Sequence, residues 1–126
     1  MTDNEIRAAL ERHWEFSGKD ESIAHDVYHE DAILEFPQSG ERFRGKEKFQ
    51  AWRAKYPAKT RMSIRLLRGT GDFWVAENEI TYGEDDTWQT VSILELRDGK
   101  VVRETIYVFK PFPAPDWRSP WIDRDP

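Results

Sequence analysis

One carboxylate and one imidazole stand out in this sequence because apolar residues surround them. Glu104 alternates with Val102, Ile106 and Val108 in a run typical of a β-strand, so the four side chains share one face. A carboxylate on such a face is a candidate general acid or base near neutral pH, because burial disfavours its charged form. Two plainer interpretations stay open: Glu104 lies at the rim of the apolar face, or it pairs with an Arg or Lys.

The imidazole is that of His13, which follows Ile6 and Leu10 at helical spacing and lies beside Trp14. We predict His13 as a second acid–base group. The alternative is a core or rim histidine whose ring nitrogens are satisfied by neighbouring groups.

A pair of acidic residues, Glu77 and Glu79, has a spacing of about 7 Å along one strand face, which suits paired carboxylates. The opposite face of the same run has the composition of an interior lining: Trp74, Ala76, Asn78, Ile80 and Tyr82. We therefore place the acidic pair on the outer surface and expect Asn78 and Tyr82 to be polar groups of a pocket.

Metal and nucleotide sites are not predicted. His25 and His29 are four residues apart on an expected helix, but no clear third ligand accompanies them. The stretch GERFRGKE (40–47) imitates a phosphate-binding loop, yet Glu47 stands where such a loop needs a Ser or Thr hydroxyl for magnesium. We predict instead a turn at 38–40, a short return strand at 42–44, and Gly45 at the entry to a helix.

Three helices are expected in the first half of the chain. Thr2 and Glu5 form a capping-box pattern for a helix that ends near Gly18. Asp20 can cap a second helix that ends near residues 29–32, with its apolar face formed by Ile23, Ala24, Val27 and Tyr28. The first strand then covers 32–36. A third helix carries Phe49, Trp52, Arg53 and Tyr56 on one side, and Pro57 closes it.

From Thr60 onward, β-branched and aromatic runs separated by turn residues predict four antiparallel strands. Asp98–Gly99 is typical of a two-residue hairpin loop, so Arg97 should pair with Lys100. Counting back along the ladder places Ile93 opposite Glu104 and Val91 opposite Ile106, on the face that carries Glu104. Thr90, Ser92 and Leu94 would then lie on the other face.

Composition limits the partners. The 126 residues suit one domain, 1–126, and the net charge of −5 is spread among interspersed basic and acidic residues, which argues against nucleic acid and anionic membranes. There is no cysteine, signal-peptide pattern or long apolar run, so we expect a cytoplasmic protein. Residues 111–126 read as an extended tail that Trp117 and Trp121 pin to the body; a lid over a ligand site is the alternative.

The order of these elements resembles the nuclear transport factor 2-like superfamily and, within it, SnoaL-like domains related to polyketide cyclases. The residues that carry the likeness are HEDAILEFPQSGERFRGKEKFQAW (29–52), SILELRDGKVVRETIYVF (92–109) and APDWRSPW (114–121). The resemblance implies an α+β cone, in which three N-terminal helices pack inside a strongly curved, mainly antiparallel sheet. It also implies a small apolar ligand in the open end, with Glu104 facing it and His13 near it, and a homodimer formed through the outer sheet face.

The catalytic residues of the family's enzymes are not reproduced. Phe36 stands where ketosteroid isomerases keep an Asp base, and Tyr28, the first tyrosine, comes too late for their helix-1 oxyanion group. Thr105–Ile106 replaces an Asp of the limonene epoxide hydrolases, and residues 101–110 contain no Asp of the kind some cyclases use.

The resemblance and the residues together predict a pocket for a small apolar or amphipathic molecule. Its expected lining is Trp14, Phe36, Trp52, Tyr56 and Trp74, with His13, Asn78, Tyr82 and Glu104 as polar groups. If the domain is an enzyme, cofactor-free acid–base chemistry is expected: cyclisation, isomerisation or dehydration of a carbonyl or polyketide-like compound. The alternative is a non-catalytic ligand-binding or dimerisation module.

Overall fold

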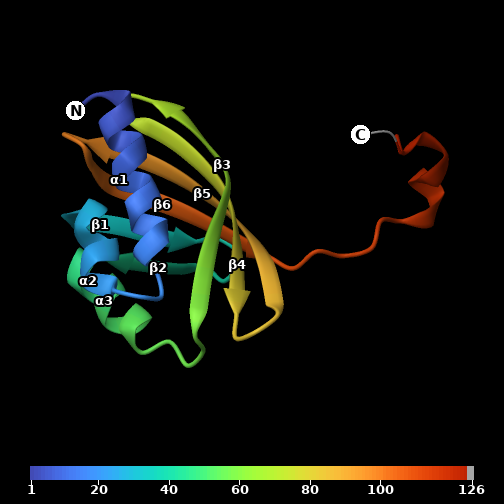
Figure 1. The fold of residues 1–126 in the computed structure, drawn as a ribbon, viewed down its shortest axis with the longest axis horizontal. Coiled ribbons are helices and arrows are strands. Elements are labelled where there is room, and N and C mark those ends of the chain that lie inside the picture. Colours follow the sequence, from blue (N-terminus) through green and yellow to red (C-terminus); the bar gives the residue numbers. More distant parts are fainter. Residues whose placement is uncertain (125–126) are drawn as a thin grey trace.

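A curved six-stranded sheet wraps around the N-terminal helices, and the C-terminal segment leaves the body from the end of the last strand (Figure 1). The structure is a computed structural model and describes residues 1–124. Its helices are α1 (Asp3–Phe16), α2 (Glu21–Ala24) and α3 (Lys46–Ala54), with short 3-10 turns η1 (His25–Val27) and η2 (Asp116–Trp121). Its strands are β1 (Tyr28–Phe36), β2 (Glu41–Arg44), β3 (Thr60–Thr70), β4 (Phe73–Tyr82), β5 (Asp86–Arg97) and β6 (Lys100–Phe109).

The sheet has the order β2-β1-β6-β5-β4-β3. Only the β1–β6 pair is parallel among the described strands, so the sheet is mixed but mainly antiparallel. The chain reaches β1 early and then builds β3 to β6 as a meander that ends beside β1. This arrangement confirms the predicted α+β cone: the sheet stays open, and the helices fill its concave side.

The predicted capping box begins α1. The Thr2 hydroxyl accepts a hydrogen bond from the Glu5 backbone N–H (3.2 Å), and the Glu5 carboxylate accepts one from the Thr2 N–H (3.0 Å). Ile6 and Leu10 then bury one face of the helix under the sheet. The buried side chains form one continuous core, in which Trp74, Tyr28, Phe49 and Leu94 are the large members.

The region of the phosphate-loop-like stretch also matches its prediction. Residues 42–44 belong to β2, which pairs antiparallel with β1. Gly45 has φ +102°, a left-handed value that favours glycine, at the point where the chain leaves β2 and enters α3. The hairpin carries the chain to α3 without the parallel sheet that a phosphate-binding loop requires.

The second helix was predicted too long. α2 stops at Ala24, η1 follows, and Tyr28 already belongs to β1 rather than to a helix face. The apolar spacing of Ile23, Ala24, Val27 and Tyr28 fits a helix, but Tyr28 gains parallel pairing with Val101 of β6, and its side chain is buried as a strand residue. Tertiary pairing therefore overrides the local pattern.

The predicted register of the β5–β6 hairpin is wrong beyond its turn. Arg97 does pair with Lys100, and Asp98 and Gly99 take the expected positive φ values of 52° and 77°. A bulge then shifts the ladder by one residue, so Leu94 pairs with Glu104 and Ser92 with Ile106. Thr90, Ser92 and Leu94 consequently share the inner face with Glu104, while Val91 and Ile93 point outward.

The expectation that two tryptophans pin the C-terminal tail to the body is also wrong for the single chain. Trp117 is 72% exposed and Trp121 is 77% exposed. Figure 1 shows this segment standing away from the sheet, and its described end lies far from the helices.

Candidate functional site

A cavity of about 580 Å³ opens between the helices and the concave face of the sheet. That volume is typical of a pocket for a small organic molecule. Its wall is largely aromatic and aliphatic, with Trp14, Phe36, Phe43, Trp52, Tyr56, Met62, Ile80, Tyr82, Ile106 and Val108. Its polar and charged groups are His13, Ser17, Glu21, Glu41, Arg53, Thr60, Thr90, Ser92 and Glu104.

Most of the predicted site residues meet in this cavity. Glu104 and His13 line it, together with Trp14, Phe36, Trp52, Tyr56 and Tyr82. They come from α1, α3 and its C-terminal end, β1, β4 and β6, so the curved sheet and the helices must both be in place to assemble them. Their positions in the wall agree with the prediction, while their chemical roles remain predictions.

Trp74 does not line the cavity. It lies at the closed end of the cone, where its neighbours in the sheet are Gly69 and Leu94, and its Nε1 donates to the Gly71 carbonyl (2.9 Å). The side chain is 1% exposed and forms part of the core. Alternation correctly placed Trp74 on the inner face but could not show how far along the cone it lies.

Asn78 is also absent from the wall, although it is fully buried. With its amide oriented to satisfy both ends, Nδ2 donates to the Glu77 carbonyl (3.1 Å) and Oδ1 accepts from Trp14 Nε1 (3.2 Å). Asn78 therefore fixes the indole that lines the cavity rather than facing a ligand itself.

Glu104 is the most buried charged residue of the site, with 1% of its surface exposed. The Tyr28 hydroxyl donates a hydrogen bond to Glu104 Oε1, and Arg53 Nη1 donates to the Tyr28 oxygen (3.2 Å). No hydrogen bond to the second oxygen, Oε2, is found within residues 1–124. One carboxylate oxygen is thus held by the protein, and the other is available to a ligand.

Arg53 links this carboxylate to a second buried group. Its Nη1 also lies 3.1 Å from His25 Nε2, and the Nδ1 of His25 lies 2.7 Å from the Glu21 carbonyl. A guanidinium can only donate and a carbonyl can only accept, so His25 carries its proton on Nδ1 and is neutral. Burial and the neighbouring guanidinium lower the pKa of His25 to about 3.

The electrostatics of the cluster follow from its burial. Burial raises the pKa of the Tyr28 hydroxyl far above its usual range, so this group stays protonated and remains a donor to Glu104. Burial disfavours the charged guanidinium of Arg53, but Tyr28 and Glu104 outweigh that cost and hold its pKa above the ordinary value. Arg53 therefore supplies the positive charge that a buried carboxylate requires.

His13 has a defined tautomer as well. Its Nδ1 lies 2.5 Å from the Ala24 carbonyl, which can only accept, so Nδ1 carries the proton. Burial lowers the pKa of His13, although Glu104 opposes this effect, and the ring is neutral at physiological pH. Its Nε2 then has a free lone pair. The ring packs edge-on against Trp14 and Tyr28, which fixes its orientation.

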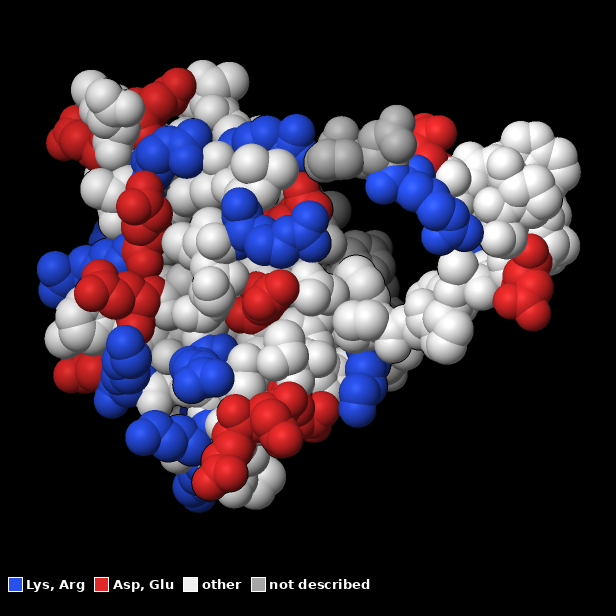
Figure 2. All heavy atoms as spheres, turned by 45° about the vertical axis from the view of Figure 1, so that its right-hand side comes forward, with Lys and Arg blue, Asp and Glu red and all other residues white. Residues whose placement is uncertain are grey.

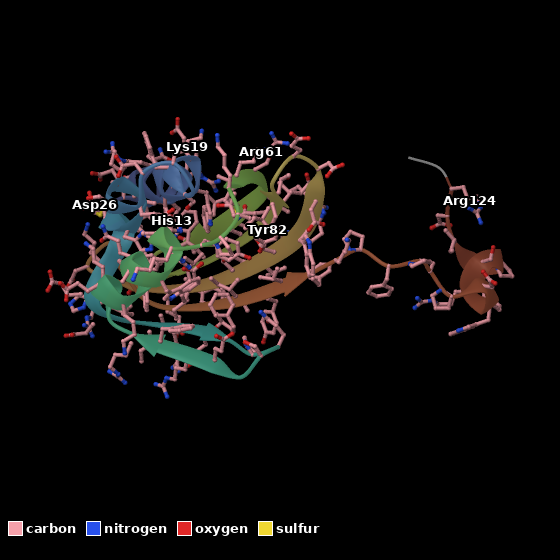
Figure 3. The ribbon with its side chains drawn as sticks, turned by 90° about the horizontal axis from the view of Figure 1, so that it is seen from below. His13, Lys19, Asp26, Arg61, Tyr82 and Arg124 are labelled. Carbon is pink, nitrogen blue, oxygen red and sulfur yellow. The ribbon has the colours of Figure 1, made fainter. Side chains whose placement is uncertain are left out.

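The mouth of the cavity is framed by two tyrosines. Tyr56 and Tyr82 stack with ring centroids 5.6 Å apart, and burial raises the pKa of Tyr82 to about 12. In Figure 3 His13 lies on the side of the helices, and Tyr82 lies nearer the strand end from which the tail departs. The neutral phenols make this entrance polar without adding charge.

Sequence reasoning missed seven polar or charged residues of the wall and Tyr28 behind it. The wall residues are Ser17, Glu21, Glu41, Arg53, Thr60, Thr90 and Ser92. The sequence pattern put Arg53 on the same side of α3 as Phe49 and Trp52. An arginine among apolar residues is a signal of a buried cation that could have been used. Tyr28 was assigned to the wrong element. Thr90 and Ser92 were assigned to the wrong face, since the bulge that turns them inward has no signature in the sequence.

The described residues contain neither a membrane-spanning helix nor a cluster of metal ligands. No helix between residues 1 and 124 is long and apolar enough to cross a membrane. Over the same residues, no group of three or more His, Cys, Asp or Glu side chains is arranged to hold a metal ion.

The chain was compared with known proteins. The sequence profile of the SnoaL-like domain matches residues 6–104. No curated protein matches the chain. Among solved structures, an NTF-2 like protein of unknown function from Burkholderia xenovorans LB400 is 43% identical, with a TM-score of 0.89 over 100% of this chain and 99% of that one.

Two other solved structures share the architecture. A protein from Kribbella flavida DSM 17836, proposed to be a ketosteroid isomerase, is 26% identical over 100% of this chain and 94% of its own, with a TM-score of 0.87. A ketosteroid isomerase-like fold from Catenulispora acidiphila DSM 44928, in complex with trimethylamine, is 16% identical over 85% and 86%, with a TM-score of 0.67, and shows the fold alone. The chain belongs to the SnoaL-like domain family and has the NTF2-like fold.

Proposed function

We propose that the cavity binds a small, largely apolar, uncharged carbonyl compound and that Glu104 transfers a proton on it without a cofactor. The observation that carries this proposal is the asymmetric environment of Glu104. Tyr28 holds Oε1, Oε2 has no partner within residues 1–124, and the residue lines a cavity with a largely apolar wall. A fixed carboxylate beside an apolar ligand is the arrangement that general acid–base catalysis needs.

The charge of the wall argues against an anionic ligand. Glu21, Glu41 and Glu104 contribute three carboxylates, and Arg53 contributes one guanidinium. Because both buried histidines are neutral, the wall carries a formal excess of negative charge, which disfavours an anionic ligand. A ketone should therefore bind better than a carboxylate of the same shape.

The proposed step is a proton transfer that balances within the site. Glu104 Oε2 takes a proton from a carbon next to the ligand's carbonyl, which leaves an enolate. The protonated Glu104 then returns the proton to another carbon, which is an isomerisation, or to a departing hydroxyl, which is a dehydration. His13 Nε2 can accept a hydrogen bond from a ligand hydroxyl and so orient it.

Hydrogen–deuterium exchange of a model ketone tests this step. Benzylacetone in deuterated buffer exchanges its α-protons slowly, and NMR follows the loss of their signals. The parent protein should accelerate the exchange, Glu104→Gln should abolish the acceleration, and Glu95→Gln, an exposed glutamate on the same sheet, should leave it unchanged. Thermal shift with benzylacetone and with hydrocinnamate, its carboxylate analogue, measures binding separately, and only the ketone should raise the melting temperature.

A non-catalytic binding module is the second candidate, and one observation favours it. Tyr28, Arg53 and His25 form a hydrogen-bonded network that can keep Glu104 as a satisfied buried charge. Under this alternative benzylacetone raises the melting temperature, but neither the parent nor Glu104→Gln accelerates exchange. His13→Ala gives a further distinction between catalysis and binding. If His13 is catalytic or orients the ligand, this variant should lower the exchange rate more than it lowers the thermal shift by benzylacetone.

We also propose a homodimer formed through the outer sheet face. Cross-strand pairing brings Val75 beside Ile93, and Val91 beside Tyr107, on the side away from the helices. These residues are partly exposed in the single chain. Tyr107→Lys should shift the sedimentation of a dimer to that of a monomer, because it places a charge in the centre of the apolar face.

A further inference from the structure

The C-terminal arm, residues 110–124, carries three large aromatic side chains that contact almost nothing in their own chain. Phe112 is 79% exposed, Trp117 is 72% exposed and Trp121 is 77% exposed. Phenylalanine and tryptophan are among the residues that contribute most to burial in cores and interfaces. Three of them exposed on one short segment indicate a surface that is covered in the functional assembly.

The arm has hydrogen bonds of its own and stands separate from the body. The hydrogen bonds found for residues 111–124 join residues of the arm itself: Arg118 N–H donates to Pro115 O, Ile122 N–H to Ser119 O, and Arg124 Nη2 to Ser119 Oγ. Figure 3 places Arg124 at the far end, well away from the sheet and helices. Figure 2, from another side, also shows the arm projecting beyond the body.

Proline sets the reach of the arm. Pro111, Pro113 and Pro115 alternate in the sequence between Phe109 and Trp117, and Pro115 has polyproline-like torsions of −64° and 138°. Such a segment extends by about 3.1 Å per residue and has few alternative conformations. The arm therefore holds its two tryptophans roughly 20 Å from the sheet end and loses little entropy when it binds a partner.

A matching surface exists on the same chain. Around Tyr107, the centre of the proposed sheet-face contact, the outer sheet face also exposes Leu66 (42%), Phe73 (54%) and Phe109 (45%). Its charges alternate in sign, as in the Arg68–Glu77 pair (3.3 Å), and Figure 2 shows acidic and basic side chains interspersed on the visible side. The arm carries three basic and two acidic side chains, so its small net charge fits this mixed surface without a charge conflict.

The area agrees with a stable dimer. An aromatic side chain buries about 150–250 Å², so two arms with three aromatics each cover roughly 1,000 Å² of arm surface and a similar area of partner surface. Specific interfaces bury about 1,600 Å² in total. In addition, the 43% identical Burkholderia protein aligns over the whole of this chain, which includes the arm.

We infer that the arm crosses to a second copy of this chain and packs Phe112, Trp117 and Trp121 against the outer sheet face of that copy, reciprocally about a two-fold axis. This inference rests on the proposed homodimer and extends it. The sheet face alone is then only part of the interface, and the arms lock the pair.

Intermolecular spin labelling tests where the arm binds. The chain has no cysteine, so Ser119→Cys offers a unique attachment site for a nitroxide on the arm. Spin-labelled chains without ¹⁵N are mixed with unlabelled ¹⁵N chains. Amide signals of β3 to β6 in the ¹⁵N chains should broaden, because the label then lies on the other molecule. In a second sample, spin-labelled ¹⁵N chains are diluted in an excess of protein that carries neither label. Broadening in this sample alone would overturn the inference, because the arm would then fold back on the sheet of its own chain.

Analytical ultracentrifugation separates the arm from the sheet face. The triple change Phe112→Ser, Trp117→Ser and Trp121→Ser should raise the dimer dissociation constant at least about 100-fold, as expected for the loss of several aromatic anchors. The control changes Asp116→Ser, Arg118→Ser and Asp123→Ser alter exposed polar residues of the same arm and should leave the constant unchanged. An unchanged dimer in the aromatic triple variant overturns the arm inference but leaves the sheet-face dimer standing, whereas a monomeric parent at all concentrations overturns both.

Discussion

The two faces of the β5–β6 hairpin reverse the usual distribution of polar and apolar residues. On the inner face Thr90, Ser92 and Glu104 are polar, yet each is at most 4% exposed. On the outer face Val91 and Ile93 are apolar and partly exposed, and Tyr107 is 42% exposed. Along β5, polar residues that are buried therefore alternate with apolar residues that are partly exposed.

The inner and the outer face each carry side chains whose burial or exposure the single chain does not explain. Buried polar groups around a cavity cost stability unless they are hydrogen-bonded, so they point to a role toward a ligand. Exposed apolar groups on a sheet face point to a protein partner. The inner face is organised for a small molecule and the outer face for a second chain, and the following predictions test that division.

The largest effect should come from Leu94, which lies on the inner face and is buried in the core. Leu94→Ala removes a fully buried side chain from the core and should lower the free energy of unfolding by about 3 kcal/mol. Ile93→Ala, one residue away on the outer face, should cost less than about 1 kcal/mol in dilute protein. Urea unfolding at low protein concentration gives both values. Equal costs would show that the outer face is already covered within one chain.

A comparable loss is expected at Arg53 because it compensates a buried carboxylate. Arg53→Met should destabilise the fold by about 3 kcal/mol, since Glu104 and Tyr28 lose their cation. Adding Glu104→Gln to this variant should recover part of the loss. The matched control is Arg68→Met on the outer face, whose exposed pair with Glu77 should contribute at most about 1 kcal/mol. No recovery in the double variant would argue against coupling between Arg53 and Glu104.

Acidification should destabilise the fold through its two buried histidines, His13 and His25. The folded pKa values of His13 and His25 lie below the ordinary value near 6.5, so the unfolded chain binds more protons below that pH. Their contribution to stability is complete above pH 6.5 and decreases as the pH falls, by up to about 1.4 kcal/mol per unit for each histidine. Unfolding measured from pH 7 to pH 5 should show this slope. His25→Gln should reduce it.

The smallest effect concerns the hydroxyl of Thr90, which is buried without a hydrogen-bond partner within residues 1–124. Thr90→Val keeps the shape and removes the unsatisfied group, so stability should rise by about 1 kcal/mol. If the hydroxyl serves a ligand, the same variant should bind benzylacetone more weakly. Calorimetry measures both quantities. A destabilised Thr90→Val would mean that the hydroxyl is satisfied in solution.

Much of the fold could be predicted because its signals are local. The capping box at Thr2 and Glu5 marks the start of α1, Pro57 lies just beyond α3, and Asp98–Gly99 sets the tight turn of the last hairpin. Each of these depends on torsions or hydrogen bonds within a few residues. The family was indicated by a resemblance, carried by the order of the elements and by residues 29–52, 92–109 and 114–121.

The site was only partly predictable because its contacts are long-range. The resemblance and the residue pattern together predicted Trp14, Phe36, Trp52, Tyr56 and Tyr82 as pocket residues, and these line the cavity, as do Glu104 and His13. Trp74 and Asn78 have the same inward orientation but lie elsewhere in the cone. Periodicity gives the face of a strand and not the depth along it.

The sequence by itself determined the capped first helix, the helix-entry glycine at 45 and the tight final turn, since these depend on local torsions and hydrogen bonds. Its resemblance to SnoaL-like domains indicated the family. Only the tertiary structure decided that a one-residue bulge turns Thr90 and Ser92 inward. Only it brought Tyr28 to Arg53 across 25 residues and to Glu104 across 76. A bulge and a buried charge network are stabilised by the packing of the whole sheet, so no local pattern encodes them.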